Sequence, residues 1–178
     1  MHTRLAQPTD AAALARVHVD TWRTAYRGIV PDEHLASLSY EARAKRWEET
    51  LSTTDGPGFV YVAQDDSGNV VGFATGGPER SGDPIYRGEL YAIYLLASHQ
   101  RKGLGRHLVA AVVNRLMQTG FDSMLIWVLT QNPSRKFYEA LGGQPVREKE
   151  IVIGGATLTE VAYGWPDIRA LALQEEWR

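Results

Sequence analysis

The sequence has no cysteine, no long apolar run and no marked excess of one charge. Without cysteine, disulfides, thiolate metal ligands and a cysteine nucleophile are excluded. No stretch approaches the roughly 18 apolar residues of a membrane-spanning helix, and the first residues lack the apolar segment of a secretory signal. We therefore expect a soluble, cytoplasmic protein that does not bind membranes. A net charge of −2 argues against general binding of nucleic acid.

The composition is that of a globular protein. A chain of 178 residues, of which 44% are hydrophobic, is long enough for one domain with its own core. Neither an internal repeat nor a low-complexity linker interrupts it. We expect a single domain over residues 1–178 with a short helical tail over residues 166–178.

Residues 89–117 are the most informative stretch. Residues 89–96 form a nearly continuous apolar run, which predicts a strand buried on both faces. Residues 104–117 repeat apolar side chains every three to four positions, which predicts an amphipathic helix. The loop between them carries two glycines and three cations: Arg101, Lys102, Gly103, Gly105 and Arg106.

This loop is suited to binding a phosphate group. Backbone amides at a helix N-terminus are unpaired, and the helix dipole favours an anion there. Gly103 and Gly105 lack a Cβ, so a phosphate could approach the main chain closely. The alternative is an ordinary strand-to-helix turn with a solvated basic rim. The P-loop pattern is absent, and the dinucleotide pattern G-x-G-x-x-G fails at its third glycine, which is Leu108.

Residues 100–105, Gln-Arg-Lys-Gly-Leu-Gly, resemble the Q/R-x-x-G-x-G/A signature of the GNAT superfamily of acyl-CoA N-acetyltransferases. The preceding strand and the following helix match the context of that signature. The resemblance implies that the loop amides bind the pyrophosphate of coenzyme A, with acetyl-CoA as the cosubstrate and no metal. The loop residues that it assigns to the cofactor are Gln100, Arg101, Lys102, Gly103, Leu104, Gly105 and Arg106.

The rest of the chain predicts the order strand, helices, two strands, strand–helix, strand–helix and hairpin. Strands are expected at residues 3–7, 59–64, 70–75, 122–129, 144–153 and 157–163. Helices are expected from an N-cap at Thr9 or Asp10 to about residue 25, then at 31–38, 39–51 and 132–141. Residues 76–84 are expected to be a flexible loop. His18, on the inward face of the first helix, is expected to be a core residue.

This order resembles the GNAT fold, a mixed α/β (α+β) fold. Its central sheet is mostly antiparallel and flanked by helices, and its parallel strands splay around the cofactor. Residues 132–143 look like a second family motif, in which a helix after the fifth strand contacts coenzyme A and carries a tyrosine. The resemblance therefore adds Asn132, Lys136 and Tyr138 to the cofactor site. Ala97 stands where many members have proline, which concerns loop rigidity.

Transfer of an acyl group from a thioester to an amine requires a neutral amine, a donor for the oxyanion and a proton for the leaving thiolate. Tyr138 is the best acid, because its phenol has a pKa of about 10 against about 8.5 for a thiol. Core packing is the alternative role for Tyr138. In the family, the backbone of the central strand, here Ile93, Tyr94 and Leu95, follows the pantetheine arm, and the amide of Leu95 is a candidate oxyanion donor.

Glu89 is the candidate base, acting through water, as carboxylates on this strand often do in the family. Strand alternation would place Glu89 on the same side as Tyr91, Ile93 and Leu95. The alternative, a solvated residue at the strand end, is about equally supported.

The sequence therefore predicts an acyltransferase of the N-acetyltransferase class, which moves an acetyl group from acetyl-CoA to a primary amine by direct attack in a ternary complex. Trp22, Tyr26 and Tyr91 are expected to wall the acceptor site, with core packing as the alternative for Trp22 and Tyr26. The acceptor is a small-molecule or peptide amine, and a homodimer is left open. Two other functions are left open: a non-catalytic acyl-CoA binding or sensing module of the same fold, and a nucleotide-phosphate binder.

Overall fold

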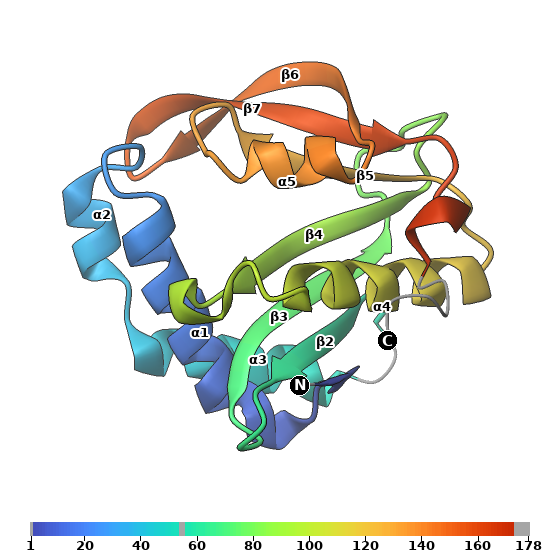
Figure 1. Ribbon diagram of the computed structural model, residues 1–178. Helices are drawn as coiled ribbons and strands as arrows, with labels where there is room; N and C mark the ends of the chain where they lie inside the picture. The colour runs from blue at the N-terminus through green and yellow to red at the C-terminus, as the bar shows by residue number, and fades with distance from the viewer. Residues whose placement is uncertain (1, 54–55, 173–178) are drawn as a thin grey trace.

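The computed structural model describes residues 2–53 and 56–172. It contains one seven-stranded sheet with helices packed on both faces (Figure 1). The strands are β1 (His2–Leu5), β2 (Phe59–Gln64), β3 (Val70–Pro78), β4 (Gly88–Leu95), β5 (Met124–Leu129), β6 (Gln144–Ile153) and β7 (Ala156–Trp165). The α-helices are α1 (Ala11–Ala25), α2 (Asp32–Ser37), α3 (Tyr40–Ser52), α4 (Leu104–Gln118) and α5 (Arg135–Ala140). Short 3₁₀ turns are η1 (Pro8–Asp10), η2 (Ala97–His99) and η3 (Arg169–Leu171).

The strands lie in the order β1-β2-β3-β4-β5-β7-β6. β4 and β5 run parallel, and the other neighbouring strands run antiparallel. The prediction of a mixed, mostly antiparallel sheet flanked by helices is therefore confirmed.

Two hydrophobic cores hold the helices to the sheet. On one face, α4 buries Leu104, Leu108, Val112 and Leu116, each at most 2% exposed, and these residues recur every four positions as the periodicity predicted. On the other face, α1 and α3 pack against the β2–β3 hairpin. Full burial of one such aliphatic side chain stabilises the fold by roughly 1.5–3 kcal/mol, so these two faces fix the sheet between its helices.

The prediction of a flexible loop over residues 76–84 was partly wrong. β3 continues to Pro78, because Gly76, Gly77 and Pro78 pair with Leu90, Glu89 and Gly88 of β4. Glycine and proline locally favour a turn. Pairing with β4 overrides that preference, and the local sequence gives no sign of this pairing.

One helix lacks the predicted side-chain cap, and another begins later than predicted. α1 starts at Ala11 with Asp10 as its N-cap residue, one of the two predicted, but the Asp10 carboxylate accepts hydrogen bonds from the Gln7 amide (2.8 Å) and from Arg4 (2.7 and 2.8 Å) instead of capping the helix. α5 starts at Arg135, because Asn132 Oδ1 accepts from the Ser134 amide at 2.9 Å and forms a turn instead of a helix cap. In the predicted helical tail the structure describes the turn η3, and residues 173–178 lie outside the described residues.

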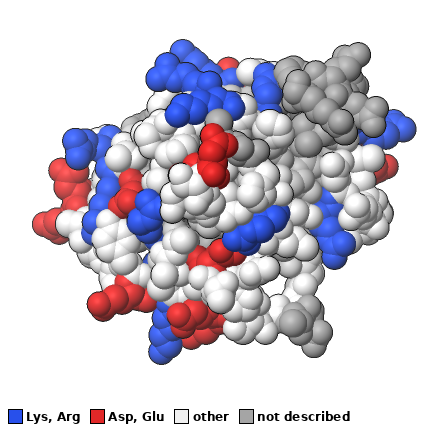
Figure 2. All heavy atoms as spheres, turned by 60° about the horizontal axis from the view of Figure 1, so that its bottom comes forward, with Lys and Arg blue, Asp and Glu red and all other residues white. Residues whose placement is uncertain are grey.

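Charges of both signs are spread over the face of the molecule seen in Figure 2. This distribution agrees with the small net charge of −2. Within the part of the chain that the structure describes, no helix is long and apolar enough to cross a membrane.

His18 lies in an aromatic cluster between α1 and the sheet, as the prediction of a core residue requires. Its ring is 5.2 Å from Tyr94, 5.8 Å from Phe73 and 5.9 Å from Trp22. Its Nδ1 atom is buried and has no hydrogen-bond partner among the described residues. Burial, with a smaller contribution from the charge of Arg43, lowers the pKa of His18 from 6.5 to about 3. The histidine is therefore neutral in the folded protein at neutral pH.

We predict that His18 makes the fold sensitive to mild acid. Below the unfolded pKa of about 6.5, the unfolded chain takes up a proton that the folded chain refuses, so stability is lost as pH falls toward 3. This costs up to about 1.4 kcal/mol per pH unit. His18→Phe keeps an aromatic ring without this titration and should lose less stability between pH 7 and pH 5. Denaturant unfolding of both proteins measures this, and parallel losses would contradict the prediction.

Candidate active site

A cleft of about 800 Å³ opens between β4 and β5. The two strands pair only at Gly88 with Met124 and at Glu89 with Leu125, and then diverge. Residues 91–95 of β4 line one wall of the cleft and residues 126–128 of β5 line the other. The predicted splaying of the parallel strands is therefore present.

The backbone of β4 presents a free strand edge to this cleft. The amide of Leu96 donates to the carbonyl of Val71 at 2.9 Å. Because hydrogen-bonding direction alternates along an antiparallel strand, Tyr94 also bonds toward β3, whereas the backbone groups of Ile93 and Leu95 point the other way. An extended ligand in the cleft could pair with these groups.

The loop between β4 and α4 forms one end of the cleft. Gly103, the N-cap residue of α4, has φ 84, a left-handed conformation that glycine adopts without strain. The amides of Arg106 and His107 bond the Gly103 carbonyl, and no described residue accepts from the amides of residues 103–105. Arg101 and Arg106 also line this end. Unpaired amides, a helix N-terminus and cations together suit a phosphate group.

Gly105 has a packing role that the sequence did not indicate. A Cβ placed there would lie 3.2 Å from the ring of Phe137, so the missing side chain makes room for α5 to pack against α4. Besides the predicted close approach of a phosphate, which stays a prediction, Gly103 supplies a left-handed turn and Gly105 supplies room for the contact between the two helices.

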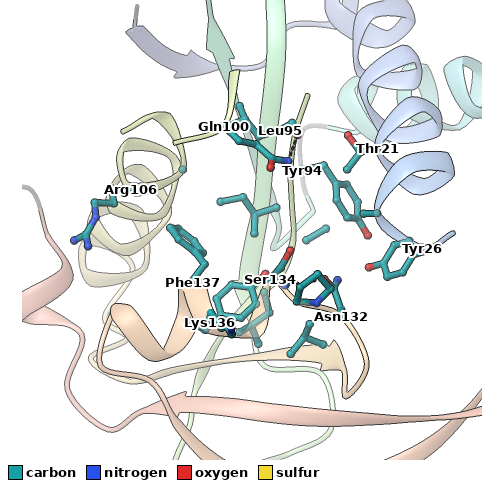
Figure 3. A pocket seen from close by; sticks show the side chains of 18 of the residues that line it. Thr21, Tyr26, Tyr94, Leu95, Gln100, Arg106, Asn132, Ser134, Lys136 and Phe137 are labelled. Atoms are coloured by element: carbon teal, nitrogen blue, oxygen red, sulfur yellow. Dashed lines mark hydrogen bonds between the residues drawn. The ribbon is translucent and has the colours of Figure 1, made fainter. Parts of the chain in front are cut away.

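Gln100 fastens the loop to the end of β4, because its side-chain amide donates to the Leu95 carbonyl at 2.9 Å (Figure 3). Two predicted cofactor residues do not line the cleft: the side chain of Lys102 is exposed, and that of Leu104 lies in the core. All the other predicted cofactor residues line the cleft: Ile93, Tyr94, Leu95, Gln100, Arg101, Gly103, Gly105, Arg106, Asn132, Lys136 and Tyr138.

Tyr138 lies in the wall formed by α5. Its side chain is 5% exposed and packs beside Phe137 and Tyr163, at ring distances of 5.5 and 6.1 Å. Burial raises the pKa of the Tyr138 phenol above its ordinary value, and the neighbouring Tyr94 adds to this effect. Among the described residues, none hydrogen-bonds the hydroxyl. Tyr138 is thus a protonated phenol in the wall of the cleft, able to donate to a ligand.

A second cavity of about 470 Å³ adjoins the cleft. Five residues line both spaces and mark their junction: Tyr26, Tyr91, Tyr94, Trp127 and Val128. Trp22 lines the second cavity but not the cleft. The three predicted acceptor-site aromatics, Trp22, Tyr26 and Tyr91, therefore come together around this cavity.

Glu89 shares a side of β4 with Tyr91, as predicted, but not with Ile93 and Leu95. Thr75 pairs with Ala92 and Gly76 with Leu90, so Tyr91 is an extra, bulged residue that reverses the alternation. Leu90, Ile93 and Leu95 consequently share the α4 core. Glu89 faces the second cavity. The expectation that Glu89 shares a side with Ile93 and Leu95 was wrong, because the alternation rule assumes a regular strand.

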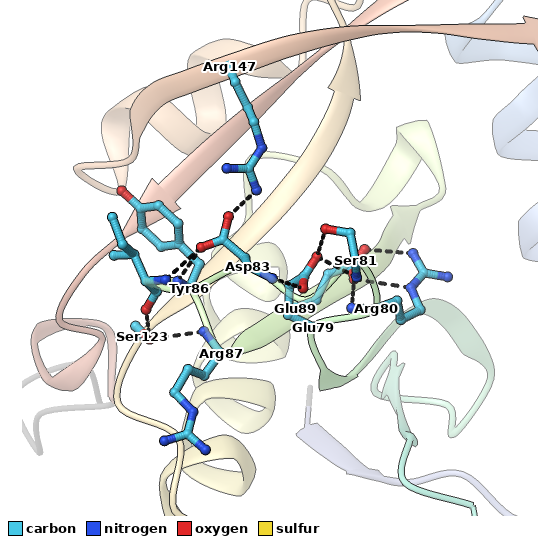
Figure 4. Close-up of polar contacts among 10 residues, drawn as sticks. Glu79, Arg80, Ser81, Asp83, Tyr86, Arg87, Glu89, Ser123 and Arg147 are labelled. Atoms are coloured by element: carbon cyan, nitrogen blue, oxygen red, sulfur yellow. Dashed lines mark hydrogen bonds and ion pairs between the residues drawn. The ribbon is translucent and has the colours of Figure 1, made fainter.

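Glu89 is 3% exposed and is held by Arg80 (Figure 4). Arg80 Nη2 lies 2.6 Å from Glu89 Oε1, and Arg80 Nε lies 3.0 Å from Glu89 Oε2. The Arg80 amide also donates to Oε2 at 3.2 Å. The Arg80 guanidinium carbon lies 4.3 Å from the centre of the Tyr91 ring. Sequence reasoning missed Arg80, because it sits in a glycine-rich segment with no motif around it.

A family model described as FR47-like protein matches residues 83–152. The uncharacterized N-acetyltransferase YuaI of Bacillus subtilis (strain 168) is 47% identical over 168 residues, which cover 94% of each chain. The L-amino acid N-acyltransferase MnaT of Escherichia coli (strain K12) is 24% identical over 143 residues, covering 80% of this chain and 78% of MnaT.

Among solved structures, the PaiA N-acetyltransferase of Thermoplasma acidophilum in complex with coenzyme A is similar with a TM-score of 0.70. It is 20% identical, and the match covers 90% of this chain and 98% of that one. Sequence, fold and cleft agree: the chain belongs to the GNAT superfamily of N-acetyltransferases. It is accordingly an acyltransferase.

We predict that Gly105→Val weakens coenzyme A binding about tenfold or more by pushing Phe137 and α5 away from α4, because an added Cβ already meets the ring at 3.2 Å. Replacing Phe137 with Leu in the same protein should recover part of that affinity. Calorimetry on both folded variants tests this. If the second change gives no recovery, Gly105 matters for phosphate approach and not for helix packing.

Proposed function

We propose that this protein transfers an acetyl group from acetyl-CoA to a primary amine by direct attack in a ternary complex. The observation that carries the proposal is the junction of two cavities, one beginning at the helix N-terminus with unpaired amides and the other reaching Glu89. Each substrate would have its own entrance, and both would meet beside Tyr91 and Tyr94.

The cleft between β4 and β5 fits acetyl-CoA as a substrate. The amides of residues 103–105 and the side chain of Arg101 would bind the pyrophosphate. The backbone groups of Ile93 and the amide of Leu95 would pair with the amide groups of the pantetheine arm, as a neighbouring strand would. In this arrangement the Leu95 amide is the candidate donor to the thioester oxygen.

The chemistry divides between two residues. The neutral amine attacks the thioester carbonyl carbon, and the carbon–sulfur bond breaks as the amide bond forms. The leaving thiolate takes the hydroxyl proton of Tyr138. Because burial raises the phenol pKa of Tyr138, full transfer of its proton costs more free energy than transfer from a free phenol. A hydrogen bond from Tyr138 to the developing thiolate is therefore an important part of its proposed role.

Glu89 is proposed to receive the amine proton through water. Tyr26, Tyr91 and Tyr94, the tyrosines at the junction, have pKa values raised by burial, so they are protonated and cannot serve as bases at neutral pH. Both oxygens of Glu89 already accept from Arg80. A relaying water would therefore have to share those oxygens with Arg80.

The direct test is release of free thiol from acetyl-CoA over a panel of amines. Thiol release that depends on an added amine supports the proposal. Tight binding of coenzyme A without turnover of any amine would support the non-catalytic acyl-CoA binding module. Thermal stabilisation by ATP or NAD in place of coenzyme A would support the nucleotide-phosphate binder.

We predict that Tyr138→Phe lowers kcat about 100-fold or more with little change in coenzyme affinity, because only the proton donor is removed. Tyr163→Phe is the matched control. Its ring lies 6.1 Å from Tyr138, but its hydroxyl binds Glu139 at 2.7 Å. A near-normal kcat in Tyr138→Phe, when chemistry limits turnover, would remove Tyr138 from the mechanism.

We predict that Glu89→Gln lowers kcat/KM at neutral pH and recovers part of it at high pH, where free amine becomes abundant. The measurement is kcat/KM from pH 6 to 10, with melting temperatures alongside. Glu160→Gln, which changes another carboxylate of the same cavity, should keep the wild-type profile. Parallel profiles for Glu89→Gln and wild type would assign Glu89 a structural role.

A further inference from the structure

The carboxylates of the second cavity are already occupied by partners within the protein. Glu89 is bound by Arg80, and Glu160 lies 3.2 Å from Lys149 Nζ. Glu79 accepts from the Ser81 amide at 2.9 Å and from the Asp83 amide at 2.8 Å. Each of these carboxylates therefore already has a partner within the protein. The charged N–H donors of the cavity, which could bind an anionic group of a ligand, lie on its cations.

Arg80 is the cation with the most unused capacity. A guanidinium has five N–H donors, and Glu89 takes two of them, at Nε and Nη2. Both donors of Nη1 and one of Nη2 have no acceptor among the described residues. The Arg80 side chain is 63% exposed, whereas that of Glu89 is 3% exposed. One edge of the guanidinium thus faces the buried glutamate, and other donors remain available to a ligand.

The segment that carries Arg80 is held by several hydrogen bonds and an ion pair (Figure 4). Glu79 closes the turn through its bonds to residues 81 and 83. Asp83 accepts from the amides of Ile85 and Tyr86, both at 2.8 Å, and its other oxygen pairs with Arg147 of β6. The guanidinium also rests on the Tyr91 ring. Because Arg80 is fixed before a ligand arrives, little conformational entropy would be lost on binding.

The remaining walls of the cavity are apolar. They include Trp22, Trp127, Leu129, Ile151 and Ile153. The Tyr91 ring under Arg80 also lines the junction with the cofactor cleft. A ligand bound to the free edge of Arg80 therefore has apolar surface around it and the acetyl-transfer position nearby.

We propose that Arg80 binds a carboxylate of the acceptor, so that the substrates are small amino acids with apolar side chains. The planar fork of Arg matches a carboxylate better than a point charge does. A zwitterion adds no net charge beside the neutral Glu89–Arg80 pair, and its side chain fits the apolar walls. This inference rests on the proposed acetyl transfer and makes Arg80 the residue that determines specificity.

The test compares acceptors that share a side chain and differ in the carboxylate. L-Phenylalanine, L-phenylalaninamide and phenethylamine form one set, and L-leucine, L-leucinamide and isoamylamine another. Values of kcat/KM are referred to the concentration of neutral amine, because the amines differ in pKa. We expect the acids to exceed the amides about 10- to 100-fold, the range that one charge-assisted contact gives.

Arg80→Gln should bring the acid-to-amide ratio close to one, and Arg80→Lys should leave an intermediate ratio. The ratio is read within each variant, so a general loss of activity from the unpaired Glu89 cancels. The double variant Arg80→Gln with Glu89→Gln removes the unpaired charge and should also give a ratio near one. Lys149→Gln, which removes the other cation of the cavity, should keep the wild-type ratio.

Equal use of acids and amides by the wild type would overturn the inference while leaving acetyl transfer intact. So would an acid-to-amide ratio that falls in Lys149→Gln but not in Arg80→Gln. If no amine is acetylated, the proposed function fails. Calorimetry of the same acceptors with the coenzyme A-loaded protein then decides about Arg80 separately. Tighter binding of acids than of amides, lost in Arg80→Gln, supports the carboxylate site, and equal binding overturns it.

Discussion

The early divergence of β4 from β5 is the constraint on which the rest of the structure depends. Backbone amides and carbonyls that leave a sheet need other partners, and a protein interior offers few. β4 loses its β5 partner after residue 89, yet the backbone groups of Ile93 and Leu95 still point across the gap. An extended substrate with amides of its own is the partner that fits such an edge. The loop with unpaired amides lies at one end of this gap, and Tyr138 lies in its wall.

The bulge at Tyr91 lets one strand serve two cavities. A regular strand would direct Glu89 toward the same core as Ile93 and Leu95. One extra residue sends Glu89 to the α1 side of the sheet, where the second cavity lies. The first cleft can then keep an apolar floor against α4, while the Glu89 carboxylate lies in a separate cavity. Bulges often re-aim side chains beside active sites in this way.

Charged side chains at and near the second cavity form ion pairs with one another. Removing one member of a buried ion pair leaves the other uncompensated, which costs far more than the pair contributes. The Glu89–Arg80 pair therefore ties the order of residues 79–87 to the second cavity. The Asp83–Arg147 contact extends this coupling to β6, so one short connection links three strands around the cavity.

Much of the fold and part of the site could be read from the sequence, because those features depend on local periodicity and local backbone preference. The order of strands and helices, the free amides after Gly103, and the tyrosine on the helix after β5 are all of this kind. Burial against a common core then placed most of the expected cofactor residues along one cleft.

Other features depend on residues distant in sequence, and only the tertiary structure decided them. The side on which Glu89 lies follows from pairing between β3 and β4, the need for glycine at 105 follows from Phe137 on another helix, and the position of Arg80 follows from a network that reaches β6. Local pattern cannot report these because a one-residue bulge or an ion pair is selected by the neighbour it meets and not by the segment that carries it.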